Sequence, residues 1–402
     1  MSLLSMLYDE RVWRQFYEYK TSLVCHKSFE QELLNFIEKK EYIPVSDCIS
    51  KGKDFPLPNR SFVNKSVTQK KRVVYTYPEK ENIVLKLLTH LLLRKYNDLF
   101  ADNLYSFRPG RSAKDAVRKL TSLKLIRNMY AYKVDISNYF NSIQMPLFMP
   151  MLKQTLSDDT ELYEFLSRLL LEKHVWSKGK LISEEKGIMA GTPLASFYAN
   201  LFLSKLDFTF ESRNIPYIRY SDDIIVFAPD METAVQYADE IKSFLYSMKL
   251  KVNPDKENFF SPDEGWTFLG FCCQGGVIDI APATVKKIKA KMRRKTKSLK
   301  RWQKRNDISG EKAAAAFIRI FNSKLLEGPL NNELTWSYWF FPIINITDSL
   351  HIIDRYAQDC IRFLVSGVHR KSRFNVRYDD MKLLGYQSLV HHYYEFRRQN
   401  KI

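Results

Sequence analysis

The sequence has few cysteines and no long apolar run. Its five cysteines are scattered and form no CxxC pair, so they indicate neither a disulfide framework nor a zinc module. No apolar run reaches the roughly 18 residues that a membrane-spanning helix needs. Charged residues at positions 9–11 interrupt the stretch where a signal peptide would still be apolar. We therefore expect buried, free thiols in a soluble protein of the cytoplasm.

Internal repeats, low-complexity tracts and the glycine fingerprint of a Rossmann fold are also missing. With 45% hydrophobic and 14% aromatic residues, the 402-residue chain is expected to fold into two or three domains. Positive charge is in excess, at a formal net +18. Residues 1–60 carry nine basic and nine acidic side chains, whereas residues 283–305 hold 12 Lys and Arg and no acid. This concentration indicates a polyanionic partner.

Hydrophobic periodicity predicts a chain in which helices and strands alternate. Glycine, proline and asparagine cluster in residues 48–62, which predicts a domain boundary near residue 60. Beyond residue 283 the pattern is helical almost throughout. Apolar residues at helical spacing predict helices over 29–37, 81–100 and 232–248, and β-branched and aromatic runs predict strands over 72–78, 130–140 and 218–228.

Two adjacent carboxylates, Asp222 and Asp223, interrupt one strand-forming run. We expect a hairpin with this pair at its tip, although alone it would be explained as an exposed Asp-Asp turn. Asp135 changes that balance, because it ends another predicted strand. Carboxylates on neighbouring strands repel one another, and hard cations such as Mg²⁺ relieve that repulsion. Two such ions about 3.5–4 Å apart can catalyse phosphoryl transfer to a 3′-hydroxyl, which is the reaction of a nucleotide polymerase.

Six segments carry motifs in a fixed order. They are YSFRPGRS (105–112), KVDISNYFNSI (133–143), GIMAGTPLASFYANLFL (187–203), YSDD (220–223), LKVNPDKENFF (250–260) and FLGF (268–271). In this order the chain resembles the prokaryotic reverse transcriptases of the group II intron-like branch, over about residues 65–275.

The resemblance implies an α+β fold, a right-hand polymerase with fingers, an antiparallel palm sheet with helices, and an α-helical thumb. The expected division is a helical N-terminal extension (1–60), fingers (61–125 and 150–186), palm (126–149 and 187–280) and an α-helical, maturase-like thumb (281–402).

For catalysis, the resemblance implies Asp135, Asp222 and Asp223 as ligands of two Mg²⁺ ions, with Mn²⁺ as a substitute. Lys256 matches a lysine that protonates or electrostatically assists pyrophosphate, and simple attraction of phosphate is the alternative.

For the incoming nucleotide, the resemblance implies Phe140 as a steric gate that favours deoxynucleotides; a core aromatic ring is the alternative. Lys71 and Arg72 would clamp the triphosphate, or would form a solvated basic turn. Ile136, Ala190 and Gly191 complete the expected dNTP site. The family usually has glutamine where this chain has Ala190, which bears on fidelity and template handling rather than on catalysis.

Further residues are expected to bind nucleic acid. Arg108 and Arg111 would fix the finger loop or contact the template. The basic segment 283–305 reads as a thumb helix that packs one apolar stripe inward and lays its cations along a template–primer backbone. The apolar stripe is Val285, Ile288, Met292, Leu299 and Trp302. The other expected contacts are Tyr220, the primer-grip residues Leu269 and Gly270, and the helix cations Lys287, Lys291 and Arg294.

The chain resembles compact, defence-associated bacterial reverse transcriptases, since no nuclease segment follows and glutamine is replaced at Ala190. That implies a structured, cognate noncoding RNA as template, dNTPs as substrates, a cDNA product, no membrane partner and a role in antiphage defence. The alternatives are a group II intron-type retroelement reverse transcriptase/maturase, a template-independent, protein-primed polymerase, and a maturase-like RNA-binding protein whose polymerase site is vestigial. The oligomeric state stays open.

Overall fold

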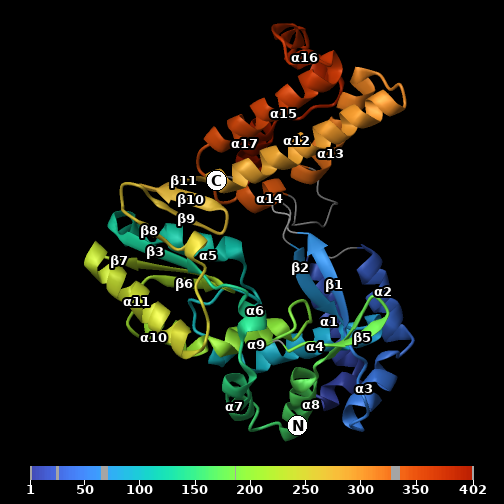
Figure 1. The fold of residues 1–402 in the computed structure, drawn as a ribbon, viewed down its shortest axis with the longest axis vertical. Coiled ribbons are helices and arrows are strands. Elements are labelled where there is room, and N and C mark those ends of the chain that lie inside the picture. Colours follow the sequence, from blue (N-terminus) through green and yellow to red (C-terminus); the bar gives the residue numbers. More distant parts are fainter. Residues whose placement is uncertain (1, 24–26, 65–70, 186, 327–335, 401–402) are drawn as a thin grey trace. The chain divides into compact units, whose positions relative to one another are not determined.

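The computed structural model of the chain divides into two units, Met1–Glu264 and Gly265–Ile402. Helices and antiparallel strand pairs occur in both units (Figure 1), so the predicted α+β fold is confirmed. None of the described helices is long and apolar enough to cross a membrane. The residues that the structure describes are 2–23, 27–64, 71–185, 187–326 and 336–400.

Helices form the N-terminal part of the first unit, as the periodicity of residues 29–37 predicts. Trp13 is fully buried there, and its ring stacks on that of Tyr42 with centroids 5.2 Å apart. The indole N–H of Trp13 donates to the carbonyl of Leu7 at 2.8 Å, so this large side chain is buried without an unpaired donor. The helices are η1 (Ser5–Tyr8), α1 (Glu10–Ser22), α2 (Lys27–Glu38) and α3 (Tyr42–Ser50).

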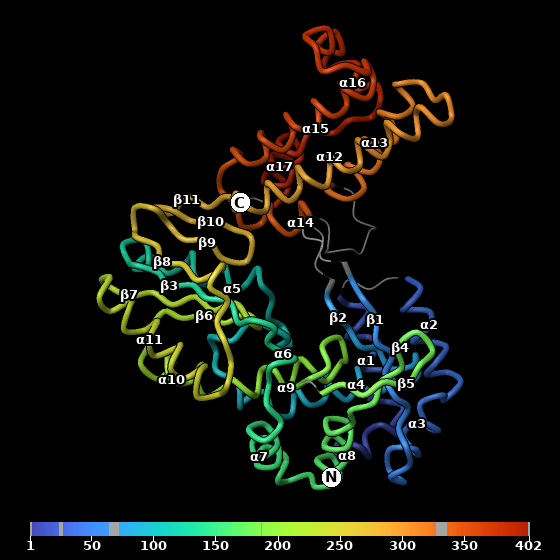
Figure 2. The backbone as a smooth tube through the Cα atoms, viewed as in Figure 1, coloured from blue at the N-terminus to red at the C-terminus, as the bar shows by residue number. Residues whose placement is uncertain are grey.

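A four-stranded sheet of order β2-β1-β4-β5 follows. β1 pairs antiparallel with β2 and parallel with β4. Figure 2 shows β4 next to β1, and β5 lies beyond β4, although β2 and several helices separate β1 from β4 in the sequence. The predicted strand at 72–78 corresponds to β2 and the predicted helix at 81–100 to α4. The bounds are β1 (Asn59–Asn64), β2 (Lys71–Thr76), α4 (Glu79–Lys95), β4 (His174–Ser177) and β5 (Lys180–Ser183).

A second, antiparallel sheet of order β6-β7-β3-β8 forms the centre of the first unit. The strands predicted at 130–140 and 218–228 supply β3 and the β6–β7 hairpin. Helix α11 packs on β3 and β7 (Figure 1), and its buried Ala234 and Ala238 allow the helix to approach the sheet closely. The strands are β3 (Tyr130–Asp135), β6 (Tyr217–Tyr220), β7 (Asp223–Ala228) and β8 (Asn258–Phe260).

The remaining helices of the first unit connect or cover these sheets. They are η2 (Asn97–Leu99), α5 (Ala113–Ser122), η3 (Lys124–Asn128), α6 (Tyr139–Ser142), α7 (Met145–Thr155), α8 (Thr160–Leu171), α9 (Ala195–Phe202), α10 (Ser204–Ser212), α11 (Met231–Ser247) and η4 (Pro254–Lys256).

The second unit combines a small antiparallel sheet with a helical bundle. Helix α15 packs against α12, α13 and α17. A Cβ at Gly310 would lie 2.4 Å from the carbonyl oxygen of Val365, so glycine lets α13 begin directly against α15. The elements are β9 (Trp266–Phe268), β10 (Phe271–Gln274), β11 (Val277–Ile280), α12 (Pro282–Arg305), α13 (Gly310–Leu325), α14 (Trp336–Phe340), α15 (Asp348–Ser366), η5 (Lys371–Asn375), α16 (Tyr378–Leu383) and α17 (Leu389–Gln399).

The basic segment is helix α12, and its apolar stripe differs from the expected one at the end. Val285, Ile288, Met292 and Leu299 are buried as expected. Trp302 is 36% exposed, and the stripe instead includes Thr296. The Thr296 hydroxyl donates to the carbonyl of Met292 at 2.9 Å, which removes the cost of burying it. The buried stripe thus ends at Leu299 and contains Thr296 in place of the expected Trp302.

The boundaries of fingers, palm and thumb stay predictions. The second unit begins at Gly265, and so it includes residues 265–280, which were expected to belong to the palm. The described cysteines form no disulfide: Cys273 and Cys360 are buried as expected, whereas Cys48 and Cys272 are only partly buried. Cys25 lies outside the described residues.

Candidate active site

Three carboxylates meet at one end of the β6-β7-β3-β8 sheet. Asp135 is the last residue of β3 and pairs in register with Asp223, the first residue of β7. Asp222 lies in the turn between β6 and β7. Oxygen atoms from the three carboxylates all lie within 4.8 Å of one another. The structure therefore brings together the three residues that the sequence predicts as metal ligands.

Backbone hydrogen bonds fix this end of the sheet. Ser221 has a φ of 59°, a left-handed conformation that a non-glycine residue adopts at some energetic cost. The backbone N–H of Ile136 donates to the carbonyl of Asp222 at 3.0 Å, and that of Asn253 donates to the carbonyl of Asp135 at 2.8 Å. Ile136 is buried, and it contacts the turn through this backbone hydrogen bond to Asp222.

The electrostatics of the cluster favour a bound cation. Burial, the largest cause, raises the pKa of Asp223 to about 6 and also raises that of Asp222, and the neighbouring carboxylates reinforce both shifts. The Lys256 ammonium lies 2.6 Å from Oδ2 of Asp135. Burial acts to lower the pKa of Lys256, but the hydrogen bond to Asp135 and the surrounding carboxylates raise it. Crowded, partly buried oxygen donors of this kind fit Mg²⁺, a hard ion that takes carboxylate ligands.

Phe140 lies in the short helix α6, which follows β3 after a left-handed residue, Asn138. Its ring is half-buried and packs against the core. The Phe140 carbonyl accepts a hydrogen bond from the N–H of Ile188 at 2.8 Å. A Cβ at Gly187 would lie 2.4 Å from the carbonyl oxygen of Ile143, so glycine is needed where this segment passes α6. The sequence reasoning missed Gly187.

Ala190 and Gly191 lie against strand β2. The carbonyl of Ala190 accepts from the N–H of Tyr75 at 2.9 Å, and Ala190 itself is buried. Gly191 has a φ of 102°, and a Cβ there would lie 3.0 Å from the Tyr75 carbonyl oxygen. Both residues therefore join the segment after β5 to β2, the strand that carries the expected triphosphate clamp.

Arg72 of that clamp is exposed on β2. Its positive charge acts to lower the pKa of Asp222, against the larger effect of burial, which raises it. The backbone of Lys71 is part of β2, but its side chain lies outside the described residues.

The two finger arginines differ in exposure. Arg108 is 6% exposed and donates to the carbonyl of Ala101 at 2.6 Å and to Oδ1 of Asn97 at 2.8 Å. Of the two expected roles, fixing the loop is the one that this geometry supports. Arg111 is partly exposed and pairs with the carboxylate of Asp102 at 2.5 Å.

The other residues expected to bind nucleic acid lie at several places. Tyr220, at the end of β6, is half-buried. Leu269 and Gly270 form the turn between β9 and β10 in the second unit, both with positive φ. The exposed cations of α12, also in the second unit, include Lys287, Lys291 and Arg294.

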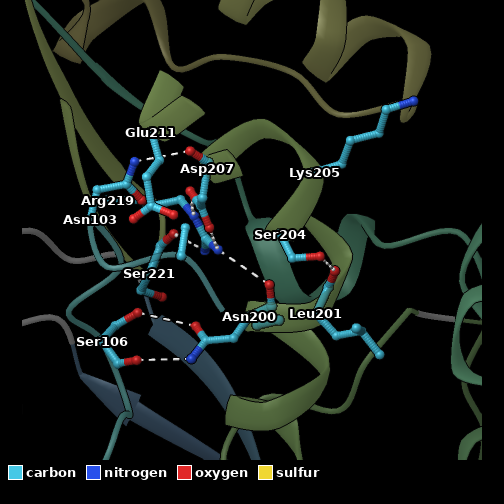
Figure 3. Close-up of polar contacts among 12 residues, drawn as sticks. Asn103, Ser106, Asn200, Leu201, Ser204, Lys205, Asp207, Glu211, Arg219 and Ser221 are labelled. Carbon is cyan, nitrogen blue, oxygen red and sulfur yellow. Dashed lines mark hydrogen bonds and ion pairs between the residues drawn. The ribbon is translucent and has the colours of Figure 1, made fainter. Parts of the chain in front are cut away.

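A buried polar network behind the turn escaped the sequence reasoning (Figure 3). Arg219 of β6 and Asp207 of α10 are both fully buried and form a two-point ion pair. Asn200 of α9 is fully buried beside them. The sequence feature that could have revealed this network is Arg219 itself, a charged residue inside an otherwise apolar and aromatic strand.

Comparison with known proteins identifies the family. Residues 59–273 match the family described as reverse transcriptase (RNA-dependent DNA polymerase), which is more than half of the chain. Protein YkfC of Escherichia coli strain K12 is 22% identical over 265 residues, covering 56% of this chain and 69% of YkfC.

Solved telomerases from two yeasts show weaker similarity. Apo telomerase from Candida tropicalis, truncated from its C-terminal domain, has a TM-score of 0.46 and 12% identity; 56% of this chain matches 55% of that one. Telomerase from Candida albicans, in complex with a TWJ fragment of telomeric RNA, has a TM-score of 0.46 and 13% identity; 88% of this chain matches 71% of that one. The assignment rests on the family match. The chain belongs to the reverse transcriptase family of RNA-dependent DNA polymerases.

Proposed function

We propose that this protein copies an RNA template into cDNA, using Asp135, Asp222 and Asp223 to hold two Mg²⁺ ions. The observation that carries this proposal is the cluster itself, with carboxylate oxygens within 4.8 Å of one another in a chain of this family. When bound, the ions would supply charge neutralisation at the attacking 3′-hydroxyl and the departing pyrophosphate.

Lys256 has a supporting role in the proposed reaction. Its pKa is raised, so it stays protonated at neutral pH beside Asp135. An ammonium in this position can offset negative charge on a bound triphosphate and can donate a proton to the leaving pyrophosphate. Attraction of phosphate without proton transfer would leave the rate of a Lys256→Arg variant near that of the wild type.

Phe140 and Arg72 would select and hold the nucleotide. The half-buried ring of Phe140 follows the strand that ends in Asp135, where it can exclude a ribose 2′-hydroxyl by contact. The exposed guanidinium of Arg72, whose charge acts on Asp222, can form two-point hydrogen bonds with phosphate oxygens.

Primer extension tests the proposed activity. Purified protein with Mg²⁺, dNTPs and a DNA primer on an RNA template should extend the primer to the template end. Asp222→Asn should abolish extension, whereas Asp379→Asn, on the exposed face of α16, should retain it. Absence of extension by the wild type on all primed and unprimed RNA templates would contradict the proposal.

The proposed biological setting is the copying of a cognate noncoding RNA in antiphage defence. Ala190 in place of the family's usual glutamine supports a specialised template over general copying. Sequencing the nucleic acids that co-purify with wild type and with Asp222→Ala tests this: one defined RNA should occur in both samples and its cDNA only in the first. Products unrelated to any bound RNA would favour template-independent synthesis, and bound intron RNA would favour a retroelement enzyme. Phage protection that is lost in Asp222→Ala completes the test.

A further inference from the structure

A buried arginine lies directly behind the turn that carries Asp222. The guanidinium of Arg219 is inaccessible to solvent, as is the carboxylate of Asp207. Nε and Nη2 of Arg219 donate to the two carboxylate oxygens of Asp207 at 2.8 and 2.5 Å. Such a two-point pair fixes the plane of the guanidinium as well as its position.

The same guanidinium bonds to the catalytic turn. Nη1 of Arg219 donates to the carbonyl of Ser221 at 3.2 Å, and Nη2 donates to the carbonyl of Asn200 at 3.2 Å. The Ser221 carbonyl belongs to the peptide group that joins Ser221 to Asp222. Because the carbonyl of Asp222 also accepts from the N–H of Ile136, the backbone of Asp222 is held on both sides.

The turn needs such support because its conformation is unfavourable in isolation. Ser221 is one of the non-glycine residues with positive φ, and a left-handed serine persists only where surrounding contacts impose it. A rotation of the Ser221–Asp222 peptide would move the Asp222 carboxylate relative to Asp135 and Asp223. A hydrogen bond to the Ser221 carbonyl opposes that rotation directly.

Further hydrogen bonds hold both members of the ion pair, Asp207 and Arg219. The Asp207 carboxylate also accepts from the hydroxyl of Tyr217 at 3.0 Å, and its backbone carbonyl accepts from Nδ2 of Asn103 at 2.9 Å. The backbone of Arg219 is tied to the segment before the YSFRPGRS motif: its N–H donates to the carbonyl of Asn103 at 3.1 Å.

The motif itself is tied to the same network (Figure 3). The N–H of Tyr105 donates to the carbonyl of Arg219 at 3.1 Å. Nδ2 of Asn200 donates to the carbonyl of Ser106 at 2.8 Å, and the Ser106 hydroxyl donates back to Oδ1 of Asn200 at 3.2 Å. A continuous chain of buried hydrogen bonds thus runs from the YSFRPGRS motif to the Asp222 turn.

We propose that Arg219, anchored by Asp207, is a positioning residue that sets the Asp222 carboxylate for metal binding. This inference rests on the proposed function, because it concerns the same metal site. Only arginine supplies enough donors in one plane to bond Asp207, Asn200 and Ser221 together. Partners that orient metal ligands typically affect metal affinity or activity by about 10–100-fold when they are removed.

The test compares Arg219→Lys and Arg219→Gln with Arg213→Gln. Arg213 is a matched control, because it pairs with Glu240 at 2.7 Å on the exposed surface at the end of α10. Each purified protein is measured for thermal unfolding, for Mn²⁺ binding by electron paramagnetic resonance without nucleic acid, and for kcat and KM in primer extension.

We expect both Arg219 variants to bind Mn²⁺ about 10–100-fold more weakly and to lose kcat to a similar extent. The KM for dNTP should change little, since the Arg219 side chain is inaccessible to solvent and so cannot contact a bound nucleotide. Arg219→Lys keeps the charge and one bond to Asp207 but cannot also reach Ser221, so it should fold and still lose Mn²⁺ affinity. This variant decides the question if Arg219→Gln does not fold.

Three outcomes would overturn the inference. Wild-type Mn²⁺ affinity in a folded Arg219→Lys protein would assign the ion pair to stability alone, as would a lower unfolding temperature without a change in Mn²⁺ binding. An equal loss in Arg213→Gln would mean that the effect is not specific to the turn. Failure of the wild type to extend a primer would count against the proposed function instead, and Mn²⁺ binding by the wild type would still allow the Arg219 comparison.

Discussion

Asp223 should make the stability of the metal-free protein depend on pH. Burial raises the pKa of this carboxyl from 3.8 to about 6, a shift of about two pKa units. Each unit corresponds to about 1.4 kcal/mol of difference between the two protonation states. Protonation of Asp223 therefore favours the folded, metal-free protein by about 3 kcal/mol in total.

The sign follows from the direction of the shift. The folded chain binds this proton more tightly than the unfolded chain, so the stabilisation is fully present below about pH 3.8. It is lost as the pH rises through about 6. Between pH 5 and 7.5, where denaturation is convenient to measure, the linkage relation gives a loss of about 1.4 kcal/mol from this group.

The assay is guanidinium denaturation with EDTA at pH 5 and 7.5. Asp223→Asn is isosteric and cannot ionise, so the difference in unfolding free energy between variant and wild type should change by about 1.4 kcal/mol between these pH values. Asp379→Asn, an exposed control, should follow the wild type. At pH 7.5, Mg²⁺ at 100 times its Kd should stabilise the wild type by about 2.7 kcal/mol and Asp223→Asn by less.

Parallel pH dependence in the wild type and Asp223→Asn would refute this reasoning. It would mean that the carboxyl is hydrated well enough in the folded protein to keep its ordinary pKa. The opposite slope would mean that a cation, such as the nearby Lys133, dominates over burial, because a nearby positive charge lowers the pKa of a carboxyl.

Three further substitutions test other contacts. Phe140→Val should reduce the preference for dNTP over rNTP by at least about 10-fold in single-nucleotide incorporation, equivalent to about 1.4 kcal/mol; an unchanged preference would assign the ring to the core. Gly191→Ala should lower the unfolding free energy by about 1–3 kcal/mol, because φ is 102° and the new Cβ would lie 3.0 Å from the Tyr75 carbonyl oxygen. An unchanged unfolding free energy in denaturant melts would mean that alanine is accommodated there without strain. Asp207→Asn should lower the unfolding free energy by about 3–5 kcal/mol, because it leaves the Arg219 charge buried without a counter-charge. A decrease below about 1 kcal/mol would show that water or another group solvates the guanidinium.

Local pattern and motif order predicted much of the site. The run around Asp222 and Asp223 has the composition of a hairpin, and Asp135 ends a run of the same kind. Register pairing of Asp135 with Asp223 is the natural outcome when two such strands are neighbours in one sheet. The basic helix was equally readable, since four of its five expected apolar positions are buried.

The buried arginines could not be predicted in the same way. Arg108 was expected to fix the finger loop or to contact the template, and no sequence pattern singled out Arg219, yet both are buried and bonded to protein oxygens. Their partners come from other segments, and Asp207 in particular meets Arg219 only because α10 packs beside β6. Sequence spacing carries no information on such pairs.

The family motifs, the three carboxylates at predicted strand ends and the concentration of positive charge in one helix can all be read from the residues in order. These features are local, so residue order and hydrophobic period are enough to find them. The distances between the carboxylates, the burial of Asp223 and the choice of the arginine that supports the turn are set by the packing of the folded chain. Those properties depend on strands and helices from distant parts of the chain, which set the local exposure to water and hence the strength of every charge interaction at the site.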